Sequence, residues 1–81
     1  TILNGDYEVI EAEIIETSEL INKELKDSNL PNEIRIGAIL REDKVIIPRS
    51  NFIFKKNDSV VLLAKKDQLQ TVESMFRLTS V

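Results

Sequence analysis

Residues 34–64, IRIGAILREDKVIIPRSNFIFKKNDSVVLLA, decide the fold of this chain. Three apolar runs are separated here by one tight turn and one longer connection, and the density of Ile, Val, Leu and Phe is typical of the middle of a sheet. The stretch predicts a small α+β domain. It contains no pattern that names a chemistry.

The first apolar run, residues 34–41, predicts a strand. Alternation along a strand places Ile34 and Leu40 on one face and Ile39 on the other. Gly37 in the interior indicates a bulge or the close approach of another group, because glycine weakens a regular strand.

Residues 41–44, with the sequence REDK, predict a tight turn in which Asp43 tolerates a positive φ. The turn leads into a short strand over residues 45–47, and Pro48 ends that strand because it lacks a backbone donor. The connection over residues 49–57 contains three successive apolar side chains and is expected to fold back against the core. Residues 59–64 then predict the central strand of the sheet, buried on both faces.

Upstream of this stretch, residues 1–6 predict an incoming linker, and the alternation that begins at Tyr7 predicts a strand with one solvent-exposed face. Four acidic side chains belong to this region: Glu8, Glu11, Glu13 and Glu16. They form either a solvated edge or a site for a hard cation, and their spread over two strand faces favours the solvated edge.

Two helices are predicted. The first begins at Thr17 or Ser18, either of which can cap it, and ends before Pro31. Its apolar stripe consists of Leu20, Ile21 and Leu25. The second begins near Asp67, and its apolar residues at helical spacing are Leu69, Val72, Met75 and Phe76.

The predicted fold is therefore α+β, a small sheet of about four strands with two helices in the order β-α-β-β-β-α. The domain is expected to cover residues 7–77, with a short tail at residues 78–81.

The composition limits the possible functions. The 81 residues contain neither Cys nor His, which removes disulfides, thiolate nucleophiles, the usual zinc sites and the usual general base. Two glycines cannot supply a glycine-rich phosphate loop, so the chain is not expected to be an enzyme or to contain a catalytic, cofactor or metal site.

The partners are limited by charge and size. The net charge of −3 and the scattered basic residues argue against nucleic acid, and no apolar run is long enough for direct membrane insertion. A domain of 81 residues has a modest core, which favours association with a second copy. The chain begins at Thr1, which suggests a piece of a longer polypeptide.

The residues now support a family resemblance. Residues 37–76, GAILREDKVIIPRSNFIFKKNDSVVLLAKKDQLQTVESMF, resemble the C-terminal lobe of the RCK family, the TrkA-C domain. The matching features are Arg41 at the end of a strand, the apolar pair before Pro48, Asp58 at the start of an apolar strand, and a closing helix. Residues 13–25 fit the family's first strand and helix. The ending VESMF is particularly similar to the end of the peripheral subunits of Trk potassium uptake systems.

The resemblance implies a regulatory role in potassium transport. In the family, an N-terminal Rossmann lobe binds NAD(H) or adenine nucleotides, and the C-terminal lobe dimerises. NAD or ATP would therefore belong to a lobe that this chain lacks. The implied protein is cytoplasmic and peripheral at the inner face of the cell membrane. It forms a homodimer through this lobe and couples ligand binding to gating of a membrane-embedded potassium transporter subunit. The same lobe also serves channels, antiporters and other carriers, so a transporter of another ion is an alternative.

Some relatives bind cyclic di-AMP between two C-terminal lobes, at an isoleucine-proline corner with an arginine and an asparagine upstream. Ile47 and Pro48 match this corner. At the family's spacing, however, the arginine falls on Leu40 and the asparagine on Ile46.

Two arginines close in sequence, Arg41 and Arg49, are candidate substitutes for these polar contacts. The candidate effector-binding residues are therefore Arg41, Ile47, Pro48 and Arg49. Arg41 has a competing interpretation as a solvated residue paired to a carboxylate. An effector-sensing lobe with its ligand at the dimer seam is the alternative to a purely coupling lobe.

Asn22 and Asn57 stand where the family usually has glycine. Asparagine is the natural substitute where φ is positive. The dimer seam is expected to include apolar side chains of the second or third strand or of the first helix, and a charge at Ile39 or Ile47 is expected to weaken association.

Overall fold

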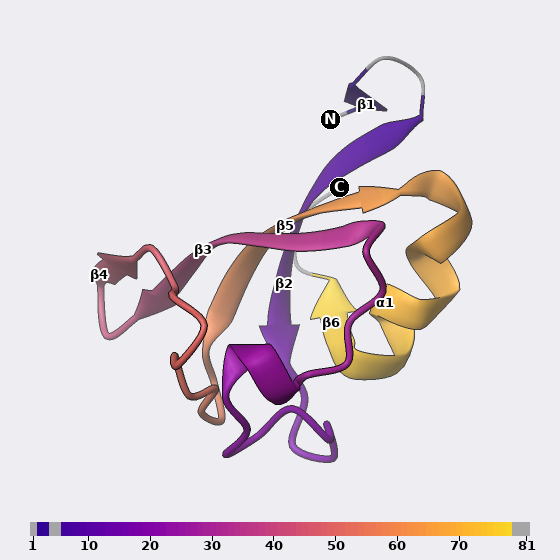
Figure 1. The fold of residues 1–81 in the computed structure, drawn as a ribbon. Coiled ribbons are helices and arrows are strands. Elements are labelled where there is room, and N and C mark those ends of the chain that lie inside the picture. The colour runs from indigo at the N-terminus through magenta and orange to yellow at the C-terminus, as the bar shows by residue number, and fades with distance from the viewer. Residues whose placement is uncertain (1, 4–5, 79–81) are drawn as a thin grey trace.

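The computed structural model describes residues 2, 3 and 6–78, the first two by their backbone alone. In this part of the chain, six strands form one antiparallel sheet with the order β1-β2-β5-β3-β4, and β6 also pairs with β2 (Figure 1). The strands are β1 (Ile2–Leu3), β2 (Tyr7–Ile14), β3 (Ile34–Arg41), β4 (Lys44–Ile46), β5 (Ser59–Lys65) and β6 (Phe76–Leu78). The α-helix α1 (Leu69–Met75) follows a short 3-10 turn, Lys66–Gln68.

The predicted central strand is confirmed. β5 pairs with β2 along its whole length and with β3 on its other side. Its side chains alternate, with Val60, Leu62 and Ala64 buried and the residues between them half-buried. The expected burial on both faces is thus reached fully on one face only, because the described helix packs on that face.

A bulge lies at Gly37, as predicted. The register of β3 against β5 shifts between Ile36 and Ala38, and the shift reverses the faces of the residues that follow. Ile39 therefore lies in the core with no exposed surface, whereas Leu40 is exposed. The expected placement of Ile39 opposite the Ile34 face is wrong, because simple alternation ignores the extra residue.

The hairpin between β3 and β4 is confirmed. Arg41 pairs with Lys44 across a two-residue loop, and the loop residues Glu42 and Asp43 have φ of 51° and 65°. Two successive positive φ angles define a type I′ turn, whose twist matches that of the flanking strands. β4 begins one residue earlier than predicted and ends one residue earlier, at Ile46.

The predicted first helix is wrong. Residues 17–28 form turns and one 3-10 turn, Leu25–Asp27, because their amides bond to another segment of backbone rather than within a helix. Asn22 N–H donates to the Phe54 carbonyl at 2.8 Å, and Leu25 N–H donates to the Phe52 carbonyl at 2.8 Å. Asn22 has a φ of 68°, which also interrupts a helix. The apolar stripe still packs against the core, since Leu20 is 1% exposed and Ile21 and Leu25 are half-buried.

The fold class is α+β as predicted, but the element order is corrected at three places. β1 lies within the expected linker and pairs with β2. Only one of the two predicted helices is present in the described residues, and it ends at Met75, so that Phe76, which was expected on the helix, lies beyond it. Phe76 then has extended backbone angles and opens β6, which pairs with β2 and extends into the expected tail. Residues 79–81 of that tail lie outside the described residues.

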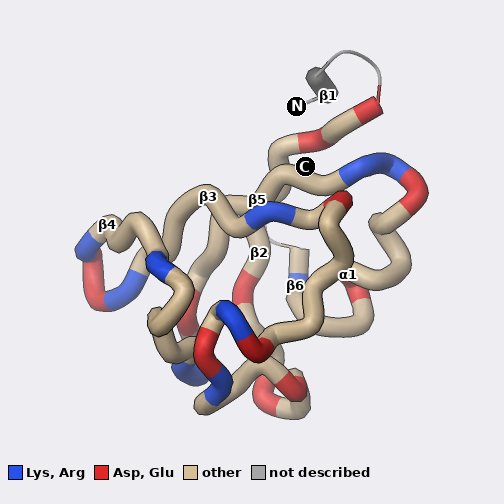
Figure 2. The backbone as a smooth tube through the Cα atoms, in the orientation of Figure 1, with Lys and Arg blue, Asp and Glu red and all other residues tan. Residues whose placement is uncertain are grey.

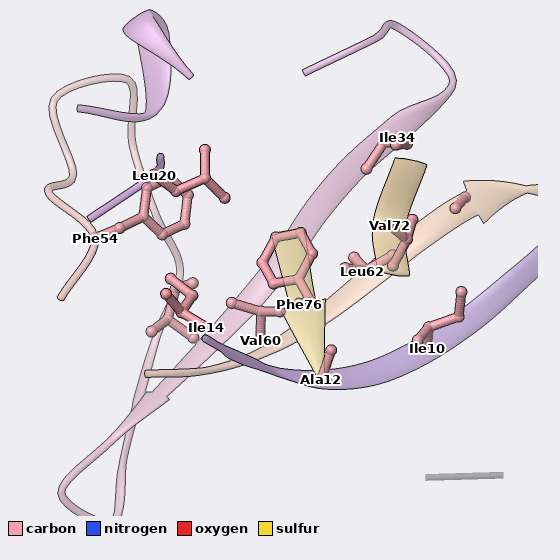
Figure 3. Close-up of a cluster of buried hydrophobic side chains, with 12 residues drawn as sticks. Ile10, Ala12, Ile14, Leu20, Ile34, Phe54, Val60, Leu62, Val72 and Phe76 are labelled. Carbon is pink, nitrogen blue, oxygen red and sulfur yellow. The ribbon is translucent and has the colours of Figure 1, made fainter. Parts of the chain in front are cut away.

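The core lies between one face of the sheet, α1 and two irregular segments, residues 17–28 and 49–57 (Figure 3). The sheet supplies Ile10, Ala12, Ile14, Ile34, Ile39, Val60, Leu62, Ala64 and Phe76, and α1 supplies Val72. Leu20 and Phe54 come from the irregular segments, and Phe54 has no exposed surface. The prediction that residues 49–57 fold back against the core is confirmed.

Candidate functional site at the β3–β4 edge

The end of β3 is fixed to the start of β5 by one ion pair. Arg41 donates from Nε to Oδ1 of Asp58 at 2.7 Å and from Nη2 to Oδ2 at 2.6 Å. Asp58 is 1% exposed, and its Oδ2 also accepts the Lys55 backbone N–H at 2.8 Å. The carboxylate is therefore satisfied on both oxygens, as a buried charge requires.

The other contacts of Arg41 hold the connection between β4 and β5. Its Nη2 donates to the Ile53 carbonyl at 2.9 Å, and its guanidinium lies 4.9 Å from the centre of the Phe52 ring. The hydrogen bond to Asp58 raises the pKa of Arg41 above its ordinary value. Arg41 therefore shows the carboxylate pairing that competes with a ligand-binding role.

A surface hollow of about 460 Å³ lies beside this ion pair. Its lining residues are Arg41, Glu42, Lys55, Lys56 and Asn57. Asp58 already neutralises Arg41, and Lys56 lies 3.0 Å from Oε1 of Glu16. The cations around the hollow are thus largely balanced by carboxylates, so the charge favours no particular ligand.

The other three candidate residues follow β4. Ile47 is 72% exposed, Pro48 is half-buried and Arg49 is exposed. The Arg49 carbonyl accepts the Phe52 N–H at 3.0 Å, which makes a tight turn after the proline. Their role in binding an effector stays a prediction.

The positions that carry polar contacts in cyclic di-AMP-binding relatives are apolar here. Leu40 is 39% exposed, and Ile46 is half-buried and packs against the core. Neither side chain can donate a hydrogen bond to phosphate or base.

A second cluster of charges lies at the C-terminal end of β2, next to the first hollow, because Asn57 lines both. Glu13, Glu16 and Arg77 line an open hollow of about 410 Å³, and the hydrogen bond from Lys56 lowers the pKa of Glu16. In the described part of the chain, no three His, Cys, Asp or Glu side chains lie close enough together to hold a metal ion. Nor does that part contain a helix long and apolar enough to cross a bilayer.

Two residues of this edge were missed by sequence reasoning. Asp58 stood out as a turn residue before an apolar strand, but nothing in the sequence pairs it with a residue 17 positions away. Val45 is 67% exposed although it was counted as an apolar strand residue. The signal for Val45 was the brevity of its strand, because a short strand closed by proline is typical of a sheet edge.

Comparison with known proteins gives a consistent family assignment. The TrkA-C domain family matches residues 9–77. The Trk system potassium uptake protein TrkA of Azorhizobium caulinodans is 39% identical over 79 residues, which cover 98% of this chain and 17% of the relative. A TrkA homolog of Archaeoglobus fulgidus is 34% identical, with 79% of this chain and 15% of the relative covered. TrkA of Haemophilus influenzae is 32% identical, with 95% and 18% covered. The chain therefore spans less than a fifth of the length of each of these relatives.

Proposed function

Because the chain belongs to the TrkA-C domain family, we propose that it is the regulatory C-terminal lobe of a TrkA-like potassium uptake protein. The observation that supports this most directly is the match to TrkA over 98% of the chain. The lobe's work is to hold two subunits together and to couple ligand binding elsewhere to the gating of a membrane-embedded transporter.

The surface of the domain supports a coupling role rather than a catalytic one. The most exposed large apolar side chains of the described residues, Val45 and Ile47, lie together at the β4 edge. An exposed apolar patch at a sheet edge is typical of a contact with another protein chain. The proposed protein works in the cytoplasm at the inner face of the membrane, and its NAD or ATP site belongs to an N-terminal lobe.

Potassium uptake by the full-length protein tests this function. Val45→Glu is introduced into the parent protein and expressed in a strain that needs it to grow at low potassium. We expect growth to fail while the protein level stays unchanged. Gln70→Glu, which adds the same charge on an exposed part of α1, is the matched control and should grow normally. Normal growth of the Val45→Glu strain would contradict a coupling role for this edge.

An effector-sensing lobe is the second candidate. It is supported by the exposed Ile47 beside Pro48, and it is weakened by the apolar Leu40 and Ile46. A thermal-shift screen of this chain with cyclic di-AMP, ATP, ADP, NAD and NADH separates the two candidates, because a ligand that binds only the folded state raises the melting temperature. A shift with one of these ligands supports a sensor, and its loss in Ile47→Ala would place the ligand at this corner. A transporter of another ion stays an alternative. Repeating the growth test with another ion in place of potassium examines it.

A further inference from the structure

The sheet has a second face, opposite the one that packs on α1 and the two irregular segments. The pairing registers place Val9, Leu63, Val61, Ala38 and Leu40 on this second face, on three adjacent strands. Val61, Leu63 and Ala38 are half-buried, Val9 is 38% exposed and Leu40 is 39% exposed. None of these five residues belongs to the core or to the apolar residues packed against it. The described elements thus cover one face of the sheet and leave apolar side chains of the other in contact with solvent.

The sequence of β5 favours burial of this second face as well. An antiparallel strand with one solvated face alternates apolar and polar residues, whereas residues 60–64, VVLLA, are apolar at every position. Val61 and Leu63, which point to the second face, lie in the middle of the sheet, where β2 and β3 flank them on both sides. A contiguous apolar patch on a surface marks a contact with another element or chain.

The five apolar side chains form a diagonal strip across the second face. Val9 lies opposite Leu63, Val61 lies opposite Ala38 two residues along, and Leu40 follows two residues further on β3. With about 4.8 Å between strands and about 3.4 Å per residue, the diagonal strip from Val9 to Leu40 is about 17 Å long. This length equals about eleven residues, or about three turns, of an α-helix.

Opposite charges border the two sides of the diagonal strip. Glu11 lies on one side, and Arg35 and Lys65 lie on the other. Glu13, further along β2, lies opposite Arg77 of β6, which balances its charge. Figure 2 shows the same division, with acidic residues along β2 and basic residues at the start of β3 and the end of β5. Glu11 and Arg35 are two strands and two residues apart, which is about 12 Å and close to the diameter of a helix with its side chains.

We propose that the second face of the sheet docks an amphipathic α-helix that belongs to the same parent polypeptide, outside residues 1–81. The inference rests on the proposed function, since it names a contact through which the lobe is joined to the rest of a TrkA-like protein. The helix lays about three turns of apolar side chains on the diagonal strip. It carries basic residues on the side that meets Glu11 and acidic residues on the side that meets Arg35 and Lys65.

The lengths of the relatives favour an occupant from the same polypeptide. This chain covers 17%, 15% and 18% of the three TrkA proteins compared above, so most of their length lies outside the matched lobe. A segment tethered to the lobe by a short flexible linker has an effective concentration in the roughly millimolar range, so a small contact is enough to hold it. A separate partner usually buries about 1,600 Å², which a strip about 17 Å long and about 12 Å wide does not provide.

Labelling of single cysteines in the parent protein tests the docking, because residues 1–81 contain no cysteine. Leu40→Cys and Val9→Cys probe the two ends of the diagonal strip. Ile53→Cys is the matched control, since Ile53 has nearly the same exposure, 41%, and lies in the connection between β4 and β5 rather than on the sheet. In a parent protein whose other reactive cysteines have been replaced, we expect a maleimide to label the two probes at least roughly tenfold more slowly than the control. Equal rates at the three positions would overturn the proposal.

Reversal of one bordering charge tests the chemistry of the occupant. Arg35 is exposed, so Arg35→Glu should leave the lobe folded but repel the acidic side of the docked helix. We expect it to speed labelling of Leu40→Cys at least roughly threefold. Lys23→Glu, the same change of charge on an exposed residue of the irregular segment 17–28, is the control and should leave the rate unchanged. A rate that responds to neither change would overturn the charge complementarity.

Dilution distinguishes a tethered helix from a separate partner. Labelling of Leu40→Cys in the purified parent protein should be equally slow at about 10 µM and about 0.1 µM, because an intramolecular contact does not depend on concentration. Labelling that becomes fast on dilution would assign the cover to a separate chain and overturn the proposed occupant.

Growth at low potassium separates failure of this inference from failure of the proposed function. The parent protein and its cysteine variants are expressed in the strain that needs the parent protein to grow. A variant that labels as fast as Ile53→Cys and still supports growth overturns the docking and leaves the proposed function standing. If the unaltered parent protein does not support growth, the proposed function fails, whereas slow labelling of Leu40→Cys and Val9→Cys would still support the docked helix.

Discussion

Nη2 of Arg41 lies 2.6 Å from Oδ2 of Asp58, and the bulge at Gly37 makes this contact possible. Without the extra residue, Arg41 would point to the outer face of β3 and Ile39 with it. The bulge therefore places one apolar side chain in the core and one charge against a buried carboxylate. It links the hairpin of the proposed contact to the start of the central strand.

Removal of the Asp58 carboxylate should destabilise the domain strongly. Asp58→Ala removes the carboxylate that accepts hydrogen bonds from Arg41 and from the Lys55 N–H, and we expect the free energy of unfolding to fall by about 3 kcal/mol. Urea denaturation followed by circular dichroism measures the change. Glu16→Gln, which removes an exposed ion pair to Lys56, is the control and should shift the midpoint far less. A midpoint equally insensitive to both changes would contradict the structural role of Asp58.

The energy of the Arg41–Asp58 pair can be separated from the cost of each residue. We expect the double variant Arg41→Ala, Asp58→Ala to be more stable than the sum of the single variants predicts, by about 1–3 kcal/mol, because the two groups contact each other directly. The measurement is a double-mutant cycle in urea. Strict additivity would show that the two side chains act independently.

Substitution of Ile39 should destabilise the monomer far more than substitution of Ile47. Ile39 has no exposed surface, so Ile39→Ala should lower the free energy of unfolding by about 2–5 kcal/mol. Ile47→Ala should change the stability of the monomer by no more than about 0.5 kcal/mol, because Ile47 is largely exposed. Thermal unfolding at low protein concentration measures both. A charge at Ile39 is accordingly expected to unfold the chain, not merely to weaken association.

At position 57, glycine should stabilise the fold at least as well as asparagine, and alanine should destabilise it. Its φ is 71°, in the left-handed region, where residues other than glycine and asparagine lose about 1–2 kcal/mol. We expect Asn57→Ala to lower the free energy of unfolding by about 1 kcal/mol and Asn57→Gly to leave it equal or slightly higher. Asn32→Ala, at an exposed position whose φ is not positive, is the matched control. A larger loss of stability in Asn57→Gly than in Asn57→Ala would contradict the left-handed conformation of this residue.

Glu16 should titrate below the ordinary value of 4.5, because Lys56 donates a hydrogen bond to its carboxylate. A carboxyl group with a lowered pKa in the folded state stabilises that state above its ordinary pKa. This contribution disappears as the pH falls through the lowered value. Carboxyl carbon shifts measured by NMR between pH 2 and 7 give the pKa directly. In Lys56→Met the pKa should return toward 4.5, and an unchanged value would assign the shift to another group.

Local signals in the sequence predicted part of this fold. The hairpin turn, the bulge at Gly37 and the central β5 each depend on residues within a few positions of one another. The segment of residues 17–28 was mistaken for a helix because an apolar stripe has the same spacing whether the backbone bonds to itself or to residues 50–54. The strand at Phe76 was mistaken for a helical turn for the same reason, since burial of the side chain is required in both.

The candidate site could likewise be predicted only in part from the sequence. Ile47 and Pro48 could be singled out because they match the isoleucine-proline corner of relatives that bind a ligand there. The partner of Arg41 could not, because Asp58 reaches it only after the hairpin and the long connection have folded. The exposure of Val45 depends on the place of β4 at the edge of the sheet, which the strand pattern alone did not fix.

The central place of β5 has a consequence for biosynthesis. β2 and β3 are the longest strands, and each pairs along its length with β5, which leaves the ribosome after both of them. In a nascent chain that ends before residue 59, β2 and β3 have been synthesised, but these two strands do not pair with each other. Stable structure therefore waits until β5 has emerged, and a truncated product is left unfolded for proteases to remove. The lobe should therefore fold only after its central strand, β5, has been translated.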